Sequence, residues 1–214
     1  VTREADDTVF IRAGPEIGVA ATKTFVSQVA TATLFSVYLA QVRNGISTKT
    51  ATRLLESVRD LPGAVQQILD QEELIKQTAL EYADSDAFFY IGRAVGYPVA
   101  LESALKLKEI SYDHAEGFPA GELKHGPLAL VTSETPVIAL LTNETRPKKT
   151  LNNVKEVKSR GAPVIGISSD PETTGHVDTT FDIPDCGAME PVVGNVALQL
   201  FAYYVADEKG RPID

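Results

Sequence analysis

The chain is 214 residues long, 43% of them hydrophobic and 23% charged, which is enough to bury one or two cores of α/β size. Its net charge of -9 and its pI near 4.9 exclude the basic surface that nucleic acid requires, so we expect no nucleic-acid partner. Cys186 is the only cysteine, which excludes an internal disulfide and a cysteine-based metal cluster and fits a reducing, cytoplasmic setting.

The first elements read from the chain are a strand and a long helix. Residues 8–12 (TVFIR) are rich in β-formers and are closed by Ala13-Gly14-Pro15, which predicts a short strand and a turn. From residue 18 onward, hydrophobic residues recur at spacings of three and four until Asn44-Gly45, which predicts one long buried helix.

The uncharged stretch at residues 24–42 approaches bilayer length, so a membrane helix is one interpretation of it. Its Ser, Thr and Gln residues favour the helix of a soluble protein instead, and we expect no membrane partner. The chain starts at Val1 without a methionine and shows no signal peptide, which indicates a fragment of a longer protein.

Two amphipathic segments, at residues 47–57 and 64–83, predict connecting helices separated by Leu61-Pro62-Gly63. A domain boundary is expected near Asp84-Ser85-Asp86. Beyond it, strand and helix patterns alternate, and their short continuous apolar runs are typical of strands buried on both faces. The pattern predicts a parallel, doubly wound α/β sheet. The expected strands are residues 87–92, 136–141, 163–168 and 181–184, and the expected helices are residues 97–112, 148–160 and 191–206.

The helix expected at residues 97–112 carries an unusual polar stripe. At about 100° per residue, Glu102, Lys106, Glu109 and Asp113 lie within roughly 60° of one another. Leu101, Ala104, Leu105 and Tyr112 point the other way. One interpretation is a solvated face with an i,i+4 ion pair worth a few tenths of a kcal/mol.

A functional interpretation of the same stripe rests on its position. The helix follows a strand that ends in Gly, and ligands of open α/β sheets bind at the carboxyl ends of strands. It leads into an expected Gly- and Pro-broken loop, residues 113–126, that ends in the corner Lys124-His125-Gly126-Pro127. We therefore look for chemistry in this helix and loop.

Three segments resemble one known family: AGPEIGVAATKTF, ALESALKLKEISYDHAEGFPAGELKHGPLAL and NVALQLFAYYVADEKGRPID. The family is the isomerase domain of glucosamine-6-phosphate synthases, the glutamine:fructose-6-phosphate amidotransferases. The resemblance implies sugar-isomerase (SIS) domains, each a flavodoxin-like three-layer α/β/α sandwich. On this basis residues 1–25 are the remnant of a first SIS domain, residues 26–85 are connecting helices, and residues 86–214 are a second SIS domain without its C-terminal tail.

The resemblance also implies roles for individual residues. Glu109 matches the carboxylate base that moves a proton between C1 and C2 of the sugar, which suits an enediol-like intermediate. His125 matches the histidine that assists ring opening from the neighbouring subunit, and an imidazole can both donate and accept a proton near neutral pH. This implies a homodimer. Lys106 belongs to the same catalytic group.

Substrate contacts follow from the same match. Glu102 lines the site, and the backbones of Val19 and Ala20 contact the sugar. Ala21 stands where the family often has serine, and Gly92-Arg93-Ala94 replaces a Gly-Arg-Gly turn. The implied ligands are fructose 6-phosphate and glucosamine 6-phosphate, and no cofactor is implied.

The remaining candidates carry less chemistry. His114 follows the helix end, so we expect it to have a cap or structural role. We expect His176 to lie in a surface loop and Cys186 to be a buried structural thiol. No histidines and carboxylates stand at metal-ligand spacing, so we expect no metal.

The predicted function is the isomerisation and amination of fructose 6-phosphate in hexosamine synthesis by the whole polypeptide. The phosphate-binding loop and the tail lysine of the family are not present in this sequence, so the piece alone is expected to be inactive. Two alternatives stay open. One is a non-catalytic SIS module that senses sugar phosphates, which would not need Glu109 and His125 together. The other is a phosphosugar isomerase without amide transfer.

Overall fold

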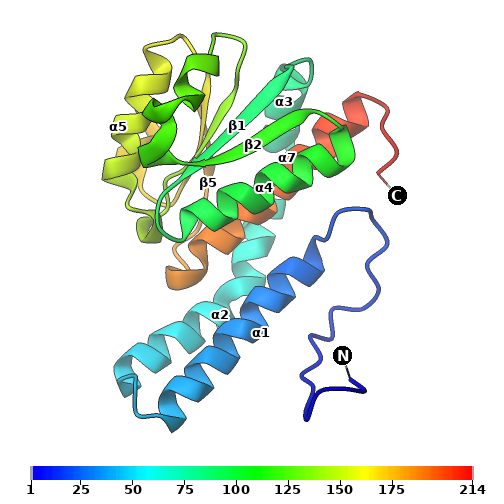
Figure 1. Ribbon diagram of the computed structural model, residues 1–214, viewed down its shortest axis with the longest axis vertical. Helices are drawn as coiled ribbons and strands as arrows, with labels where there is room; N and C mark the ends of the chain where they lie inside the picture. The colour runs from blue at the N-terminus through cyan, green and yellow to red at the C-terminus, as the bar shows by residue number, and fades with distance from the viewer. Residues whose placement is uncertain (1, 214) are drawn as a thin grey trace.

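The computed structural model describes residues 2–213, which form an α/β sandwich and a pair of long helices (Figure 1). The pair consists of α1 (Lys23–Val42) and α2 (Thr48–Leu69), and it extends downward from the sandwich in this view. The described residues before α1 follow an irregular path beside that pair. The sandwich holds the candidate residues Glu102, Lys106, Glu109 and His125.

The central layer of the sandwich is a sheet of five parallel strands in the order β2-β1-β3-β4-β5. This is the strand order of flavodoxin-like folds, in which the direction of winding changes between β1 and β3. The predicted fold class is confirmed. The strands are β1 (Ala87–Gly92), β2 (His114–Pro119), β3 (Val137–Leu140), β4 (Val164–Ser168) and β5 (Thr179–Asp182).

Strand β1 shows why the sheet is buried on both faces. Successive side chains of a strand point to opposite faces, and AFFYIG is apolar at every position before its final glycine. Phe88 and Tyr90 join one core cluster, while Phe89 and Ile91 join the other. Both faces must therefore be covered by other elements.

Helices cover the two faces unequally. The first core cluster is closed by α3 (Glu72–Tyr82), α4 (Gly96–Ser111) and α7 (Glu190–Glu208), with part of α2. The second is closed by α5 (Pro147–Lys158) and the 3-10 helix η1 (Ala120–His125). The shorter elements are η2 (Pro127–Leu130), η3 (Asn143–Thr145), α6 (Pro171–Thr174) and η4 (Gly187–Met189).

The expected loop at residues 113–126 is partly wrong, because its first half is strand β2. This strand pairs along the whole of β1, from Ala87 with His114 to Gly92 with Pro119. Glycine and proline suggest a loop, but both are tolerated in an edge strand. Gly117 is needed there, since a β-carbon at this position would lie 2.9 Å from the Leu101 backbone of α4.

The predicted strand at residues 8–12 is not formed in the described chain. Val9 and Phe10 are about two-thirds exposed instead. The backbone N–H and C=O groups of an extended segment without a neighbouring strand can form hydrogen bonds only with water. A β-rich composition therefore does not produce a strand here.

The predicted break at Leu61-Pro62-Gly63 is also wrong, because α2 runs through Pro62. A proline costs one helical hydrogen bond, and here the burial of Leu61, Ala64 and Ile68 holds the helix together. The chain breaks at Gln71 instead. The Gln71 side chain donates to the backbone carbonyl of Asp182 at 2.7 Å and accepts from its N–H at 3.1 Å, which ties the break to β5.

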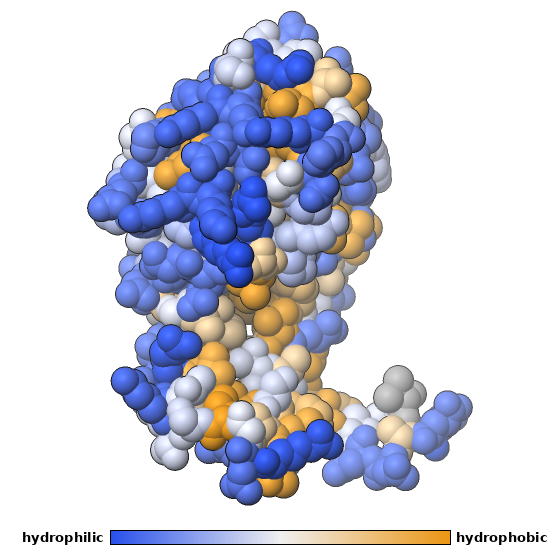
Figure 2. Space-filling model, turned by 60° about the vertical axis from the view of Figure 1, so that its left-hand side comes forward, coloured by the Kyte–Doolittle hydropathy of each residue, from blue (hydrophilic) through white to orange (hydrophobic). Residues whose placement is uncertain are grey.

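The long helix expected from residue 18 begins only at Lys23, and the expectation that it is buried is wrong. Val37 is the buried residue of α1 within the described chain. Helix α1 is long and apolar enough to cross a membrane by length and composition, which the core helix of a soluble protein also satisfies. Figure 2 shows hydrophobic surface over the part of the molecule where α1 and α2 lie. The large exposed residues of α1 are Leu34, Phe35, Tyr38, Leu39 and Val42.

Candidate functional site

Helix α4 begins at the carboxyl end of β1, after a tight turn. A β-carbon at Gly92 would lie 2.3 Å from the Gly96 carbonyl oxygen, so only glycine fits where the strand meets the helix. Ala94 has φ of +49°, a left-handed conformation that glycine adopts more readily than alanine. This turn places the start of α4 at the edge of the sheet where ligands of such folds bind.

Lys106 lies between two carboxylates of α4. Its Nζ is 3.0 Å from Glu109 Oε2 and 3.3 Å from Glu102 Oε1. The lysine is only 3% exposed, whereas both glutamates keep part of their side chains in contact with solvent. The solvated-face interpretation of the stripe is therefore wrong for its central residue. One buried ammonium holds two accessible carboxylates.

The fourth predicted member of the stripe, Asp113, points elsewhere. Helix α4 ends at Ser111, and Tyr112 turns the chain with φ of +66°. Asp113 then binds Lys209, the residue that follows α7, with 2.6 Å between Oδ1 and Nζ. Asp113 therefore fixes the end of α4 against α7.

The opposite side of α4 is less buried than its sequence predicts. Ala104 is buried, but Leu101, Leu105 and Tyr112 are all exposed. A buried polar contact sets the rotation of the helix instead: Asn195 Nδ2 of α7 donates to Ser103 Oγ at 2.8 Å. Since Ser103 is adjacent to Glu102, this bond also helps to place the polar stripe.

The turn that contains Val19 and Ala20 lies just before α1. Ala20 is buried in the same core cluster as Ala104, while Val19 is 60% exposed. The Val19 N–H donates to the carbonyl of Ile213 over 3.5 Å, so the C-terminal segment lies beside the turn.

A cavity of about 330 Å³ connects the start of α1 with the start of α4. Phe25 and Val29 of α1 form one wall, and Glu102 of α4 lies on another. The structure thus brings Glu102, Lys106 and Glu109 together and places α1 across the cavity from Glu102.

The structure does not bring His125 to this group. Its side chain is 73% exposed at the end of η1, and the carboxylate within 4 Å is that of Glu122, at 3.9 Å. An exposed imidazole at a corner is free to contact another molecule. Within the described part of the chain, Glu109 and His125 remain separate.

A polar network anchors the corner that carries His125. Lys124 Nζ lies 2.8 Å from Glu156 Oε1, and Glu156 Oε2 accepts from Asn153 at 3.1 Å. Asn153 Oδ1 in turn accepts from Arg93 at 2.9 Å. Burial alone would raise the pKa of Glu156, but the hydrogen bonds from Lys124 and Asn153 outweigh it and lower that pKa. The network ties η1 to α5 and to the end of β1.

A buried carboxylate that the sequence did not reveal, Glu190, occupies the carboxyl ends of β3 and β4. It accepts from the Asn143 N–H at 2.9 Å and from Ser169 Oγ at 2.6 Å. Burial raises the pKa of Glu190, and these hydrogen bonds oppose the rise. The Ser169 hydroxyl is thereby bound within the protein. The Glu-Pro pair at the start of α7 is the signal that could have identified it.

The other polar candidates behave as structural or surface groups. Cys186 is buried, and burial with the nearby Glu190 charge raises the pKa of its thiol to about 12. His114 and His176 are exposed. Among residues 2–213, no group of three or more His, Cys, Asp and Glu side chains is arranged to hold a metal ion.

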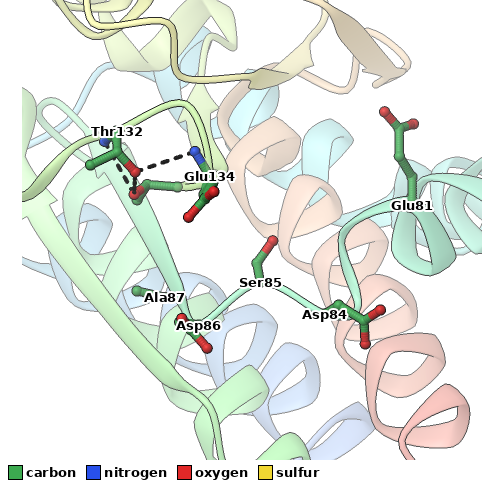
Figure 3. Close-up of a pocket in the computed structure, with 8 residues that line it drawn as sticks. Glu81, Asp84, Ser85, Asp86, Ala87, Thr132 and Glu134 are labelled. Atoms are coloured by element: carbon green, nitrogen blue, oxygen red, sulfur yellow. Dashed lines mark hydrogen bonds between the residues drawn. The ribbon is translucent and has the colours of Figure 1, made fainter.

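An acidic hollow of about 320 Å³ lies at the opposite edge of the sheet (Figure 3). Glu81 at the end of α3 and Asp84 and Asp86 in the connection into β1 line one side of it, while Glu134 lies across from them before β3. The loop that carries Glu134 is held by its own hydrogen bonds, including one from Glu134 N–H to Thr132 Oγ1. Because ligands of these folds bind at the carboxyl ends of strands, we assign this hollow no role.

Comparisons with known proteins agree with this architecture. The family model described as SIS domain matches residues 81–206. The chain is 70% identical over 214 residues to the isomerizing glutamine–fructose-6-phosphate aminotransferase of Halobacterium salinarum, and it covers 36% of that protein. It is 48% identical over 217 residues to the enzyme of the same name from Methanosarcina acetivorans, covering 35% of it. The match spans all of this chain in both cases.

A solved structure gives the same result in three dimensions. The C-terminal domain of glucosamine–fructose-6-phosphate aminotransferase from Francisella tularensis superposes with a TM-score of 0.92 at 37% identity, covering 99% of this chain and 60% of that one. These findings confirm the family resemblance that the three sequence segments carry. The chain spans about a third of the length of the relatives it matches.

Proposed function

The chain belongs to the SIS domain family, and we propose that it acts as the isomerase part of an isomerizing glutamine–fructose-6-phosphate aminotransferase. The longer protein would convert fructose 6-phosphate and ammonia to glucosamine 6-phosphate. The observation that carries the proposal is the arrangement of Glu102, Lys106 and Glu109 on α4. The relatives named above support the choice of this reaction over a sensing role.

Glu109 is the proposed base. Interconversion of a ketose and an aldose moves one proton between C1 and C2, and a single carboxylate above that bond can take the proton and return it. Glu109 uses Oε2 to bind Lys106, and about a third of its side chain is open to solvent. A substrate could therefore reach its carboxylate.

Lys106 and Glu102 would hold the base and the open-chain sugar in place. The buried ammonium fixes the position of the Glu109 carboxylate and complements its charge. Glu102 shares that ammonium and borders the cavity beside α1, where a hydroxyl of the sugar could bind. The backbone of Val19 and Ala20, in the turn before α1, would supply further contacts to the sugar.

His125 would serve the site of a neighbouring subunit and assist opening of the sugar ring. Its exposed position at the anchored η1 corner supports this role, since it is held firmly while its ring faces outward. The proposal therefore includes a homodimer. It also includes a first SIS domain that ends near residue 25, connecting helices over residues 26–85, a second SIS domain from residue 86, and a cytoplasmic location.

The test is Glu109→Gln in the full-length protein that contains this chain, assayed for glucosamine 6-phosphate formation. We expect kcat to fall by about 10²- to 10⁴-fold, the usual contribution of a general base. Glu116→Gln, which changes a half-exposed glutamate of β2, is the matched control and should leave kcat within twofold of wild type. Near-normal turnover of the Glu109 variant would refute the assignment.

A further inference from the structure

The carboxylate of Glu16 gathers four hydrogen bonds across the turn that precedes α1. Its Oε2 accepts from the N–H groups of Thr22 and Thr24, at 3.3 and 3.1 Å. Its Oε1 accepts from Thr22 Oγ1 at 3.1 Å, and the Thr24 hydroxyl donates to Oε2. One side chain therefore joins the two ends of the segment that contains Val19 and Ala20.

These hydrogen bonds take the place of the usual N-cap interaction at the start of α1. Thr22 occupies the N-cap position of α1 without a capping hydrogen bond from its own side chain, and the first turn of α1 carries no acid. The first N–H groups of a helix need acceptors, and negative charge is favourable there. Glu16 supplies both from six and eight residues upstream.

The chemistry of the Glu16 carboxyl agrees with this geometry. The hydrogen bond from the Thr24 hydroxyl is the largest influence, and with the other three it lowers the pKa of Glu16 to about 2, against the opposing effect of burial. The carboxylate therefore stays charged throughout the physiological range. A charged acceptor makes the stronger kind of hydrogen bond.

We infer that Glu16 is a positioning residue for the sugar-binding turn: it fixes the conformation of residues 17–21 and so presents the Val19 and Ala20 backbone to the substrate. The inference rests on the proposed function for the identity of the substrate. Glu16 does not touch the sugar in this scheme. It acts through the turn, which is held on its other side by the Ile213 carbonyl.

The experiment compares Glu16→Gln with wild type in the full-length protein, using fructose 6-phosphate as the probe. An amide of the same shape loses the charge and one acceptor atom, so the turn should loosen. We expect KM for fructose 6-phosphate to rise about tenfold while kcat changes less than threefold, because the stripe on α4 is untouched. Hydrogen exchange at the Thr22 and Thr24 amides, which donate to Glu16, should accelerate at least tenfold.

Two further variants separate positioning from a general loss of folding. Thr24→Val removes one donor to Glu16. It should also raise KM while leaving kcat nearly unchanged, but the rise in KM should be smaller than for Glu16→Gln. Glu56→Gln, on the exposed side of α2, is the matched control and should change neither quantity. A cooperative thermal transition confirms that each variant is folded.

The outcomes are distinct. If exchange accelerates while KM stays at the wild-type value, Glu16 shapes the turn without positioning substrate, and the inference is overturned. An unchanged exchange rate would also overturn the inference, because it would show that Glu16 does not hold the turn. If the wild-type protein itself does not bind fructose 6-phosphate, the proposed function fails instead, and the exchange data then report only the structural role of Glu16.

Discussion

Lys106 Nζ lies 3.0 Å from Glu109 Oε2, and the lysine is buried while the glutamate remains accessible. A buried ammonium without partners would be costly, so the two glutamates are what allow a lysine to occupy this position. The pairing also favours the observed position of the Glu109 carboxylate. The proposed base is thus placed by an interaction inside its own helix.

Replacing Lys106 by methionine should therefore affect stability and activity together. The change leaves Glu102 and Glu109 close to each other without a cation between them. We expect the free energy of unfolding to fall by about 2 kcal/mol, less than for a fully buried pair because water reaches both glutamates. Turnover of fructose 6-phosphate should fall at least tenfold.

Lys108→Met is the control, since Lys108 is exposed on the same helix and should change the free energy of unfolding by less than about 0.5 kcal/mol. Urea denaturation of both variants measures the difference. Equal effects of the two substitutions would contradict the structural importance of the Lys106 pairing.

Mixing two inactive variants tests whether His125 acts across a subunit boundary. In a mixed dimer of Glu109→Gln and His125→Asn chains, one site would combine an intact Glu109 with an intact His125. Random association should then restore about one quarter of wild-type activity. If both residues served the same subunit, each site would retain one defect and no activity would return.

The ion pair between Asp113 and Lys209 should couple the end of α4 to the end of α7. Both side chains are largely buried and their charged atoms are 2.6 Å apart. A double-mutant cycle with Asp113→Asn and Lys209→Met should give a coupling energy of about 1 kcal/mol.

The Lys148 and Glu172 pair offers a matched comparison for that cycle. It is 3.6 Å apart with both side chains about four-fifths exposed, and its coupling should be close to zero because solvent screens the charges. A coupling as large for the exposed pair as for Asp113 and Lys209 would show that burial is not the deciding factor.

Cys186 should react slowly with thiol reagents in the folded protein. Burial raises the pKa of its thiol to about 12, so the thiolate that reacts is scarce at pH 8, and the side chain is also inaccessible. We expect modification by a disulfide reagent to be at least 100-fold slower in buffer than in denaturant. Absorbance of the released thiol gives the rate, and rapid native modification would show that residues near α7 open readily.

Local patterns were sufficient for the elements that bury continuous apolar runs. AFFYIG gave β1 with its observed bounds, and the strand and helix alternation gave the parallel flavodoxin-like sheet, because a run that is apolar at every position requires cover on both faces. The predicted β5 lay two residues too late, since its pattern is short and half-exposed. The family segments identified the candidate site residues, whose roles remain predictions.

Long-range contacts decided the rest. TVFIR has strand composition but no partner strand in the described chain, and α2 continues through Pro62 because packing outweighs one missing hydrogen bond. The sequence placed Glu102, Lys106 and Glu109 on one side of a helix by periodicity alone. Only the tertiary structure showed that Lys106 is buried between the two carboxylates, because burial depends on neighbouring elements, such as α7 and β2, that lie far away along the chain.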